Sequence, residues 1–321
     1  MSRLFLSAFA IFLYLSVDAQ KIEIGVHGGV ANYLGDIGGK RKDAKPFFFD
    51  MHLPKINFAF GADGVVQFHH LYQIKGSFSY LRIGDSDALS IIETRRRRNL
   101  SFRNSIIEFS AVGQLDLLEL IGSIQGHTYR DFQTVARVRT DYPFYIYPYI
   151  GFGIIYSNPK TRYNGGLVAL RPLGTEGQGV IAGKKKYSPI QPIIPMGIEF
   201  QYQFNPKMKV GFDWGLRKSF TDYLDDISGT YADPTLIAAA HGSIAAALSN
   251  RTAEYTTNPD DLQYYVPGAI RGNPKRKDYY MTTTFTFIYR LDQGRRAAVP
   301  KFKRTNYSIA RRLKRNRKRK Y

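Results

Sequence analysis

Eight stretches of this sequence alternate apolar residues with polar or small ones. In the fourth stretch the two kinds fall on opposite parities, with Ile107, Phe109, Ala111, Leu115 and Leu117 on one and Glu108, Ser110, Gln114 and Asp116 on the other. Because side chains of a strand alternate with a period of two, the polar groups share one face of a sheet and the apolar groups share the other. Each stretch is close to the roughly 9–11 residues of a tilted strand that crosses a membrane. The pattern predicts an all-β fold, an eight-stranded antiparallel transmembrane β-barrel.

The spacing of the stretches indicates how the strands are connected. The predicted strands cover residues 21–33, 57–68, 74–83, 107–117, 145–156, 194–204, 209–219 and 279–289. Hairpin-sized turns at 69–73 and 205–207 alternate with long connections at 32–56, 84–104, 157–192 and 220–277. Short periplasmic turns, long external loops and an even strand number are typical of outer-membrane barrels, and they place both termini in the periplasm.

Two features of this pattern leave alternatives open. The connection 118–143 is long although it lies on the side of the short turns, so we expect it to hold an extra hairpin that lengthens strands four and five. Alternation also does not say which face meets lipid. A soluble, lipocalin-like barrel with its apolar parity inward is therefore the alternative fold.

The N-terminal residues have the organisation of a secretory signal peptide. Arg3 supplies a positive charge, residues 4–15 form a short apolar run, and Val17-Asp18-Ala19 resembles a cleavage site. An uncleaved N-terminal anchor is the alternative. The absence of cysteine excludes a lipid-modified cysteine anchor, disulfides and thiolate metal sites. We expect a signal peptide (1–19), an outer-membrane barrel (20–290) and a basic periplasmic tail (291–321).

Positive charge is concentrated in that tail. The formal net charge is +20, and residues 291–321 hold 13 Lys or Arg against one acid, Asp292. Such a block repels itself unless it meets a polyanion or an acidic surface. Export removes nucleic acid as a partner, so we expect acidic periplasmic proteins or phospholipid headgroups to bind it; a solvated, disordered tail is the alternative. The candidate binding residues are Arg311, Arg312, Lys314, Arg315, Arg317, Lys318, Arg319 and Lys320.

Two further features lie in the predicted external loops. Arg95, Arg96, Arg97 and Arg98 are candidates for contact with lipopolysaccharide phosphates, and a merely solvated loop is the alternative. Asp233-Pro234 followed by residues 235–248 predicts a capped, alanine-rich helix. Its apolar residues, Leu236, Ile237, Ile244 and Leu248, could lie on the barrel mouth or on a partner.

No catalytic, cofactor or metal site is predicted. The glycine-rich segment 174–179 resembles a phosphate-binding loop, but it lacks the spacing to a following Lys-Ser or Lys-Thr pair. Asp222, Asp225, Asp226 and Asp233 are oxygen ligands suited to calcium, yet they do not follow the spacing of a calcium-binding loop. The six histidines are scattered, and none stands at a zinc-protease spacing. We expect a protein that is not an enzyme and carries no cofactor.

Several blocks of the sequence together resemble one family. The blocks are 28–36 (GGVANYLGD), 98–103 (RNLSFR), 148–153 (PYIGFG) with 156–160 (YSNPK), 170–179 (LRPLGTEGQG) and 215–231 (GLRKSFTDYLDDISGTY). They resemble the PorG family, outer-membrane barrels of the type IX secretion system. The resemblance extends over roughly residues 25–289, and the last two blocks are the most specific.

The resemblance implies a non-enzymatic envelope component that associates with the periplasmic ring of the PorK/GldK lipoprotein and PorN/GldN. Such a protein helps to secrete cargo and, in gliding species, surface adhesins. The basic tail after Leu291 is longer than the family leads us to expect, so no family role is transferred to it. The rival functions are a stand-alone structural or adhesion barrel and a lipid-modifying barrel enzyme.

Overall fold

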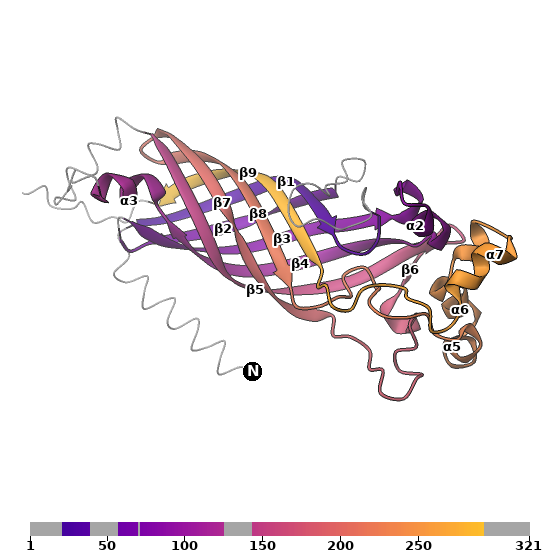
Figure 1. Ribbon diagram of the computed structural model, residues 1–321. Helices are drawn as coiled ribbons and strands as arrows, with labels where there is room; N and C mark the ends of the chain where they lie inside the picture. The colour runs from indigo at the N-terminus through magenta and orange to yellow at the C-terminus, as the bar shows by residue number, and fades with distance from the viewer. Residues whose placement is uncertain (1–20, 39–56, 70, 125–142, 292–321) are drawn as a thin grey trace, which may run out of the picture. The chain divides into compact units, whose positions relative to one another are not determined.

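The chain folds into a closed antiparallel barrel of eight strands (Figure 1). This computed structural model describes residues 21–38, 57–69, 71–124 and 143–291. The ring closes because β4 pairs with β5 as well as with β3, and because the first and last strands, β1 and β9, pair with each other. In ring order the strands are β1 (Lys21–Leu34), β2 (Asn57–Gln67), β3 (Tyr72–Ser86), β4 (Ser101–Leu115), β5 (Phe144–Tyr163), β7 (Ile190–Asn205), β8 (Met208–Ser219) and β9 (Tyr279–Leu291).

All eight predicted strands are present, which confirms the predicted fold. Strands β3, β4 and β5 are among those longer than the alternation indicated, because β3 continues to Ser86, β4 begins at Ser101 and β5 continues to Tyr163. The extra residues form a regular ladder in which Ser86 pairs with Ser101, but they lack the outward apolar residues that mark a strand in a membrane. A short strand, β6 (Gly166–Ala169), pairs only with the far end of β5.

One end of the barrel carries the long loops and the other carries the short turns. The helix α3 (Leu117–Ile124) lies at the short-turn end (Figure 1). The long-loop end carries the helices α2 (Glu93–Arg98), α5 (Pro234–His241), α6 (Ser243–Ser249) and α7 (Pro259–Leu262). The alternation had placed Leu117 in strand four, but this residue begins the helix α3. The Asp116 carboxylate accepts a hydrogen bond from Glu119 N–H, in the first turn of that helix, at 3.2 Å. Residues 118–124 are helical, and the rest of the connection in which an extra hairpin was expected, residues 125–142, lies outside the described residues.

The barrel is apolar outside and polar inside. Phe285 is 70% exposed on the outer face of β9, whereas its neighbours Thr284 and Thr286 point inward and are buried. Glu108 and Glu199 are completely buried in the lumen. This arrangement suits a barrel surrounded by lipid and is the reverse of a soluble barrel, so the lipocalin-like alternative is wrong.

An apolar core fills the lumen at the long-loop end. Side chains from the strands, such as Ile83, Ile106 and Ile155, pack there against residues of the loops, such as Leu224 and Leu248. Burial of each of these side chains stabilises the fold by about 1.5–3 kcal/mol. The loops therefore form part of the folded core and close the barrel mouth.

Short helices organise the long loops. They are η3 (Asp87–Leu89), α2 (Glu93–Arg98), η4 (Arg171–Leu173), α5 (Pro234–His241), α6 (Ser243–Ser249), η5 (Thr252–Glu254), α7 (Pro259–Leu262) and η6 (Gln263–Tyr265). The predicted cap is present, since Asp233 accepts a hydrogen bond from Thr235 N–H at 2.8 Å. The predicted single helix is broken in two, because Gly242 adopts a φ of 86° between α5 and α6. No helix among the described residues is long and apolar enough to cross a membrane.

The four apolar residues of that predicted helix do not share one environment. Ile237 and Leu248 are buried, whereas Leu236 and Ile244 are about half exposed. Leu248 of α6 belongs to the core at the barrel mouth, whereas Ile237 of α5 packs with Ala232 and Ala245.

Candidate functional site

The lumen holds a network of buried charges in the middle of the barrel. The Lys75 ammonium on β3 donates to Glu199 Oε2 on β7 at 2.7 Å and to Asp213 Oδ2 on β8 at 3.1 Å. Tyr149 OH donates to the other oxygen of Asp213 at 2.9 Å, and Gln114 donates to Glu199 at 2.7 Å. Buried charges are stable only when they are paired and hydrogen-bonded, and this lysine meets both conditions. The inward parity of each strand is what brings these side chains together.

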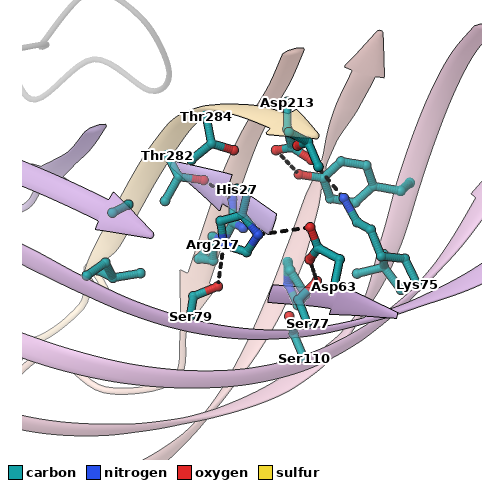
Figure 2. Close-up of a pocket in the computed structure, with 16 residues that line it drawn as sticks. His27, Asp63, Lys75, Ser77, Ser79, Ser110, Asp213, Arg217, Thr282 and Thr284 are labelled. Atoms are coloured by element: carbon teal, nitrogen blue, oxygen red, sulfur yellow. Dashed lines mark hydrogen bonds and ion pairs between the residues drawn. The ribbon is translucent and has the colours of Figure 1, made fainter. Parts of the chain in front are cut away.

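A second part of the network centres on His27 (Figure 2). Its Nδ1 lies 2.9 Å from Asp63 Oδ2 and its Nε2 lies 3.0 Å from Ser79 Oγ. Ser77 donates to the other oxygen of Asp63 at 2.6 Å. The order carboxylate, imidazole, hydroxyl is that of a nucleophilic triad.

The surroundings of this triad-like array do not admit a substrate. Ser79 is only 4% exposed, and the cavity that His27, Asp63 and Ser79 help to line has a volume of about 20 Å³. A space of that size holds about one water molecule, so a scissile carbonyl cannot reach Ser79. The array orients the imidazole inside the wall and does not form a hydrolase site.

Further ion pairs lie above and below this layer. Glu108 accepts from Arg217 at 3.4 Å and from Tyr280 OH at 2.7 Å. Near the short-turn end, Glu23 accepts from Lys209 at 2.7 Å and from Arg290 at 3.1 Å. Together with the apolar core, these layers fill the lumen, as expected for a barrel of eight strands.

At the long-loop end, the loops are tied together by buried polar contacts that we call the cap. Arg98 is one centre of the cap: it donates to both carboxylate oxygens of Asp87, at 2.7 and 2.9 Å, and to the backbone oxygens of Arg271 and Asp36. Asp87 also accepts from Gly38 N–H and Leu100 N–H, both at 3.1 Å. Bidentate pairing of this kind is among the strong hydrogen-bonding modes in proteins. One arginine thus joins three separate loops.

Arg271 and Glu176 form the second centre of the cap. Arg271 donates to Glu176 Oε1 at 3.2 Å and to the backbone oxygen of Asp226 at 2.9 Å. Glu176 also accepts from Ser228 N–H at 2.9 Å and from Gly229 N–H at 3.0 Å. The carboxylate is therefore held by a buried cation and two backbone donors. The segments 170–179 and 215–231 meet at this point.

Asp226 holds the same junction from the other side. Its backbone has a φ of 70°, a left-handed conformation that Asp adopts more readily than most residues. Its carboxylate accepts from Thr175 Oγ1 at 2.5 Å and from Tyr187 OH at 2.6 Å. Burial raises the pKa of Asp226 to about 6, and Arg271 opposes this rise.

A group of buried carboxylates lies beside this junction. Tyr33 OH donates to Asp278 Oδ1 at 2.8 Å, and Leu224 N–H donates to Asp278 Oδ2 at 2.9 Å. Burial and the neighbouring acids raise the pKa values of Asp225 and Asp278 well above the ordinary range. Burial also raises the pKa of Asp222 to about 7. Each of these carboxyl groups therefore keeps its proton to a higher pH in the folded protein than in the unfolded chain.

Two of the four carboxylates considered for calcium are engaged elsewhere. Asp226 is bound by Thr175 and Tyr187, and Asp233 caps α5. Among the residues that the structure describes, no three acidic or histidine side chains are arranged to hold a metal ion.

The four arginines predicted to contact lipopolysaccharide have different surroundings. Arg98 is buried at 8% exposure and serves the cap, so its interpretation as a surface contact is wrong. Arg95 donates to the backbone oxygen of Gly38, and Arg97 pairs with Glu93 and Asp261. Arg96 lies 3.7 Å from Glu93 on the exposed side of α2. The predicted tail residues, 311–320, lie outside the described residues.

Four of the five sequence blocks that resemble the PorG family are brought together by the fold. Tyr33 and Asp36, Arg98, Glu176, and the segment 222–229 all contribute contacts to the cap. Sequence reasoning missed Asp87, Arg271 and Asp278, which hold these blocks in place. It also missed His27, Asp63 and Ser79. The sequence indicated only that each of them occupies a lumen-facing position in its strand.

Comparison with solved structures returns small outer-membrane barrels. Ail, the attachment invasion locus protein of Yersinia pestis, in complex with a heparin analogue, is 10% identical, with a TM-score of 0.34, and the match covers 84% of this chain and 97% of Ail. Neisserial surface protein A is 7% identical, with a TM-score of 0.35 and the same coverage, 84% and 97%. A major outer-membrane protein of Thermus thermophilus is 10% identical, with a TM-score of 0.36 and coverage of 84% and 99%.

Comparison by sequence gives the family. No curated protein sequence matches the chain. One family profile matches residues 2–164, which include β1 to β4 and all of β5. The match covers 163 of 321 residues, slightly more than half of the chain. This protein therefore belongs to the family described as domain of unknown function DUF6089.

Proposed function

We propose that this protein is a non-enzymatic, non-conducting outer-membrane component of the type IX protein secretion machinery, and of gliding where that occurs, in which it anchors or scaffolds the periplasmic ring. The long loops face the outside of the cell, and both termini are periplasmic. The protein works without a cofactor. The resemblance of the loop and strand blocks to the PorG family is the starting point of this proposal.

The filled lumen is the observation that carries the scaffold role. Lys75, Glu199 and Asp213 cross-link the barrel interior, and the apolar core closes the long-loop end. A folded cargo protein has no path through such a barrel. A secretion component with a filled lumen acts through its surfaces, and its natural role is to fix other components in the membrane.

The periplasmic side supplies the proposed contact with the ring of PorK/GldK and PorN/GldN. The basic residues from Arg311 to Lys320, together with the connection 118–143, dock on an acidic face of that ring. Concentrated charge on the side of both termini motivates this assignment. Electrostatic docking predicts an affinity that falls as salt rises.

A pull-down from outer membranes in mild detergent tests the proposal. The tagged full-length protein should bring down the ring lipoprotein, as identified by mass spectrometry, and a chain that ends after Leu291 should lose the salt-dependent part of this binding. A full-length barrel that elutes without ring proteins contradicts the secretion role. A truncated chain that binds the ring with unchanged salt dependence contradicts only the role of the tail.

A stand-alone structural or adhesion barrel is the second candidate. Exposed apolar residues on the long loops favour it, in particular Ile91, Tyr264 and Ile270, which are 73%, 67% and 80% exposed. Replacing these three residues with Ser should then abolish adhesion and leave secretion intact. A lipid-modifying enzyme is the weaker rival, because the His27 array is enclosed; deletion of the gene should leave lipid A unchanged by mass spectrometry.

A further inference from the structure

The outer face of the barrel carries charge of one sign only. In the described strands, the residues of outward parity include five charged side chains, all of them basic, and no Asp or Glu. All five lie in the parts of their strands nearest the long loops: Arg82, Arg103, Lys160, Arg162 and Lys218. A need for solubility would favour charges of both signs, so it does not explain why the charged residues of the outer face are all basic and all lie toward the long loops.

Four of these residues are neighbours across three strands. Arg103 on β4 is directly opposite Lys160 on β5 in the strand register. Arg82 on β3 is opposite Ser105, which makes it the diagonal neighbour of Arg103, and Arg162 is the diagonal neighbour on the β5 side. Side chains directly opposite have Cβ atoms roughly 4.5–5.5 Å apart, and diagonal ones roughly 7–8 Å. Arg103 thus lies at the centre of a compact basic cluster, which we call the rim cluster.

The described residues offer the rim cluster no counter-charge. Like charges directly opposite in a sheet are destabilising, yet no carboxylate in the described part of the chain forms an ion pair with any of the four. Arg82 Nε is buried without a hydrogen-bond partner there, and the Arg82 guanidinium lies 4.5 Å from the centroid of the Phe58 ring. The cluster is therefore arranged for an anion that comes from outside the chain.

The position of the rim cluster indicates which anion this is. Arg82 stands one outward step beyond Tyr80, which packs with Phe58 and Phe60 at ring-centroid distances of 5.9 and 5.5 Å. Lys160 stands two outward steps beyond Tyr156 on β5. Aromatic side chains at strand ends mark the level of lipid headgroups. Basic side chains immediately beyond that level meet phosphate groups.

We propose that Arg82, Arg103, Lys160 and Arg162 form a binding site for the phosphate group of a lipid headgroup in the leaflet at the long-loop end. Arg103 and Lys160 contact the phosphate from adjacent strands. Arg82 and Arg162, on either side of this pair, add positive charge that attracts the phosphate. Arginine binds phosphate oxygens through two parallel N–H donors, and lysine acts as a point charge. This site differs from the arginine run of α2, whose members serve the cap or pair with carboxylates. It does not depend on a role in secretion.

Binding of a phosphorylated lipid to the purified full-length protein tests the site. The probes are bis-phosphorylated lipid A, the same lipid after enzymatic dephosphorylation, and inorganic phosphate, each measured by native mass spectrometry from detergent micelles. The test variant is Arg103→Glu/Lys160→Glu. The control, Lys185→Glu/Lys275→Glu, makes the same charge change on exposed loop residues at the same end. The variant Arg103→Gln/Lys160→Gln removes the charges without introducing acids, in case the reversed pair fails to fold.

The wild-type protein and the loop control should retain the phosphorylated lipid equally, and both rim variants should bind it at least about tenfold more weakly. The dephosphorylated lipid should bind weakly to all of them. Equal binding of the phosphorylated lipid by the wild-type protein and both rim variants overturns the proposal. If the wild-type protein binds inorganic phosphate as tightly as the phosphorylated lipid, the assignment to a lipid headgroup is overturned. Capture of ring proteins in the pull-down is a separate result, so failure of one proposal leaves the other intact.

Discussion

Lys75 on β3 and Glu199 on β7 form a 2.7 Å ion pair across the lumen, between strands that are not neighbours in the barrel. The pair links opposite parts of the wall, and Asp213 on β8 extends it to a third strand. Buried charges of this kind are costly unless each remains paired. The stability of the barrel should therefore be sensitive to the loss of one partner.

Replacing Lys75 with Met should destabilise the barrel by about 3–5 kcal/mol, because it leaves Glu199 and Asp213 buried without their cation. Urea unfolding of the protein in lipid vesicles measures this change. The triple variant Lys75→Met/Glu199→Gln/Asp213→Asn should recover part of the loss, since it removes the uncompensated charges. Arg96→Met, which alters an exposed pair, should change the free energy of unfolding by less than about 1 kcal/mol. A Lys75→Met protein as stable as the wild type would show that the pair is dispensable.

The protein should not conduct ions. The buried ion pairs and the apolar core at the long-loop end are separate barriers in the lumen. Single-channel recording in a planar bilayer should show no steps above background for the purified protein, under conditions in which a large porin gives clear steps. Regular conductance steps from the wild-type protein would mean that the lumen opens, and the scaffold role would lose its main support.

Arg98 should be essential to the cap, unlike its neighbour Arg96. Arg98→Ala leaves Asp87 buried without its cation, at a cost of about 3–5 kcal/mol to the local structure. Limited proteolysis of the protein in vesicles should then cleave the segment 87–100 much faster than in the wild type. Arg96→Ala should leave the cleavage rate unchanged. Equal protection of the two variants would contradict the central position of Arg98.

The cap should lose stability as the pH rises from about 4 to about 7. Burial raises the folded-state pKa of Asp222 to about 7 and that of Asp226 to about 6, above the ordinary value for Asp. In that interval the folded protein holds more protons than the unfolded chain, so the free energy of unfolding falls as protons are removed. The hydrogen-exchange protection factor of the segment 222–229, which corrects for the rise of the intrinsic exchange rate with pH, should be larger at pH 5 than at pH 8. Asp222→Asn should reduce this difference, and an unchanged pH dependence in that variant would exclude Asp222 as the cause.

The membrane-facing part of the fold could be predicted from the sequence because successive residues of each strand face the lipid and the lumen in turn. Glu108 and Phe109 show this directly, with one completely buried and the other 59% exposed. The strand ends at Ser86 and Ser101 could not be found in this way, because beyond the apolar band nothing forces an outward residue to be hydrophobic.

The sites depend on information that local sequence does not hold. His27, Asp63 and Ser79 come from three strands, and their meeting depends on the register of the closed ring. The four arginines 95–98 look alike in the sequence. Arg98 differs from the others through its distant partners, Asp87 and the backbone oxygens of Arg271 and Asp36. The blocks of the cap could be noticed together but not assembled, because their partners Arg271 and Asp278 lie far away in the chain.

The extension of β3, β4 and β5 past the apolar band has a mechanical consequence. From Tyr156 to Tyr163, β5 adds roughly 23 Å of strand at about 3.3 Å per residue, and its ladders with β4 and β6 make that extension stiff. The loops are thus held at a fixed height above the apolar band. Any molecule that reaches Ile91 or Ile270 meets them at a set distance from the membrane surface, so the barrel acts as a spacer as well as an anchor.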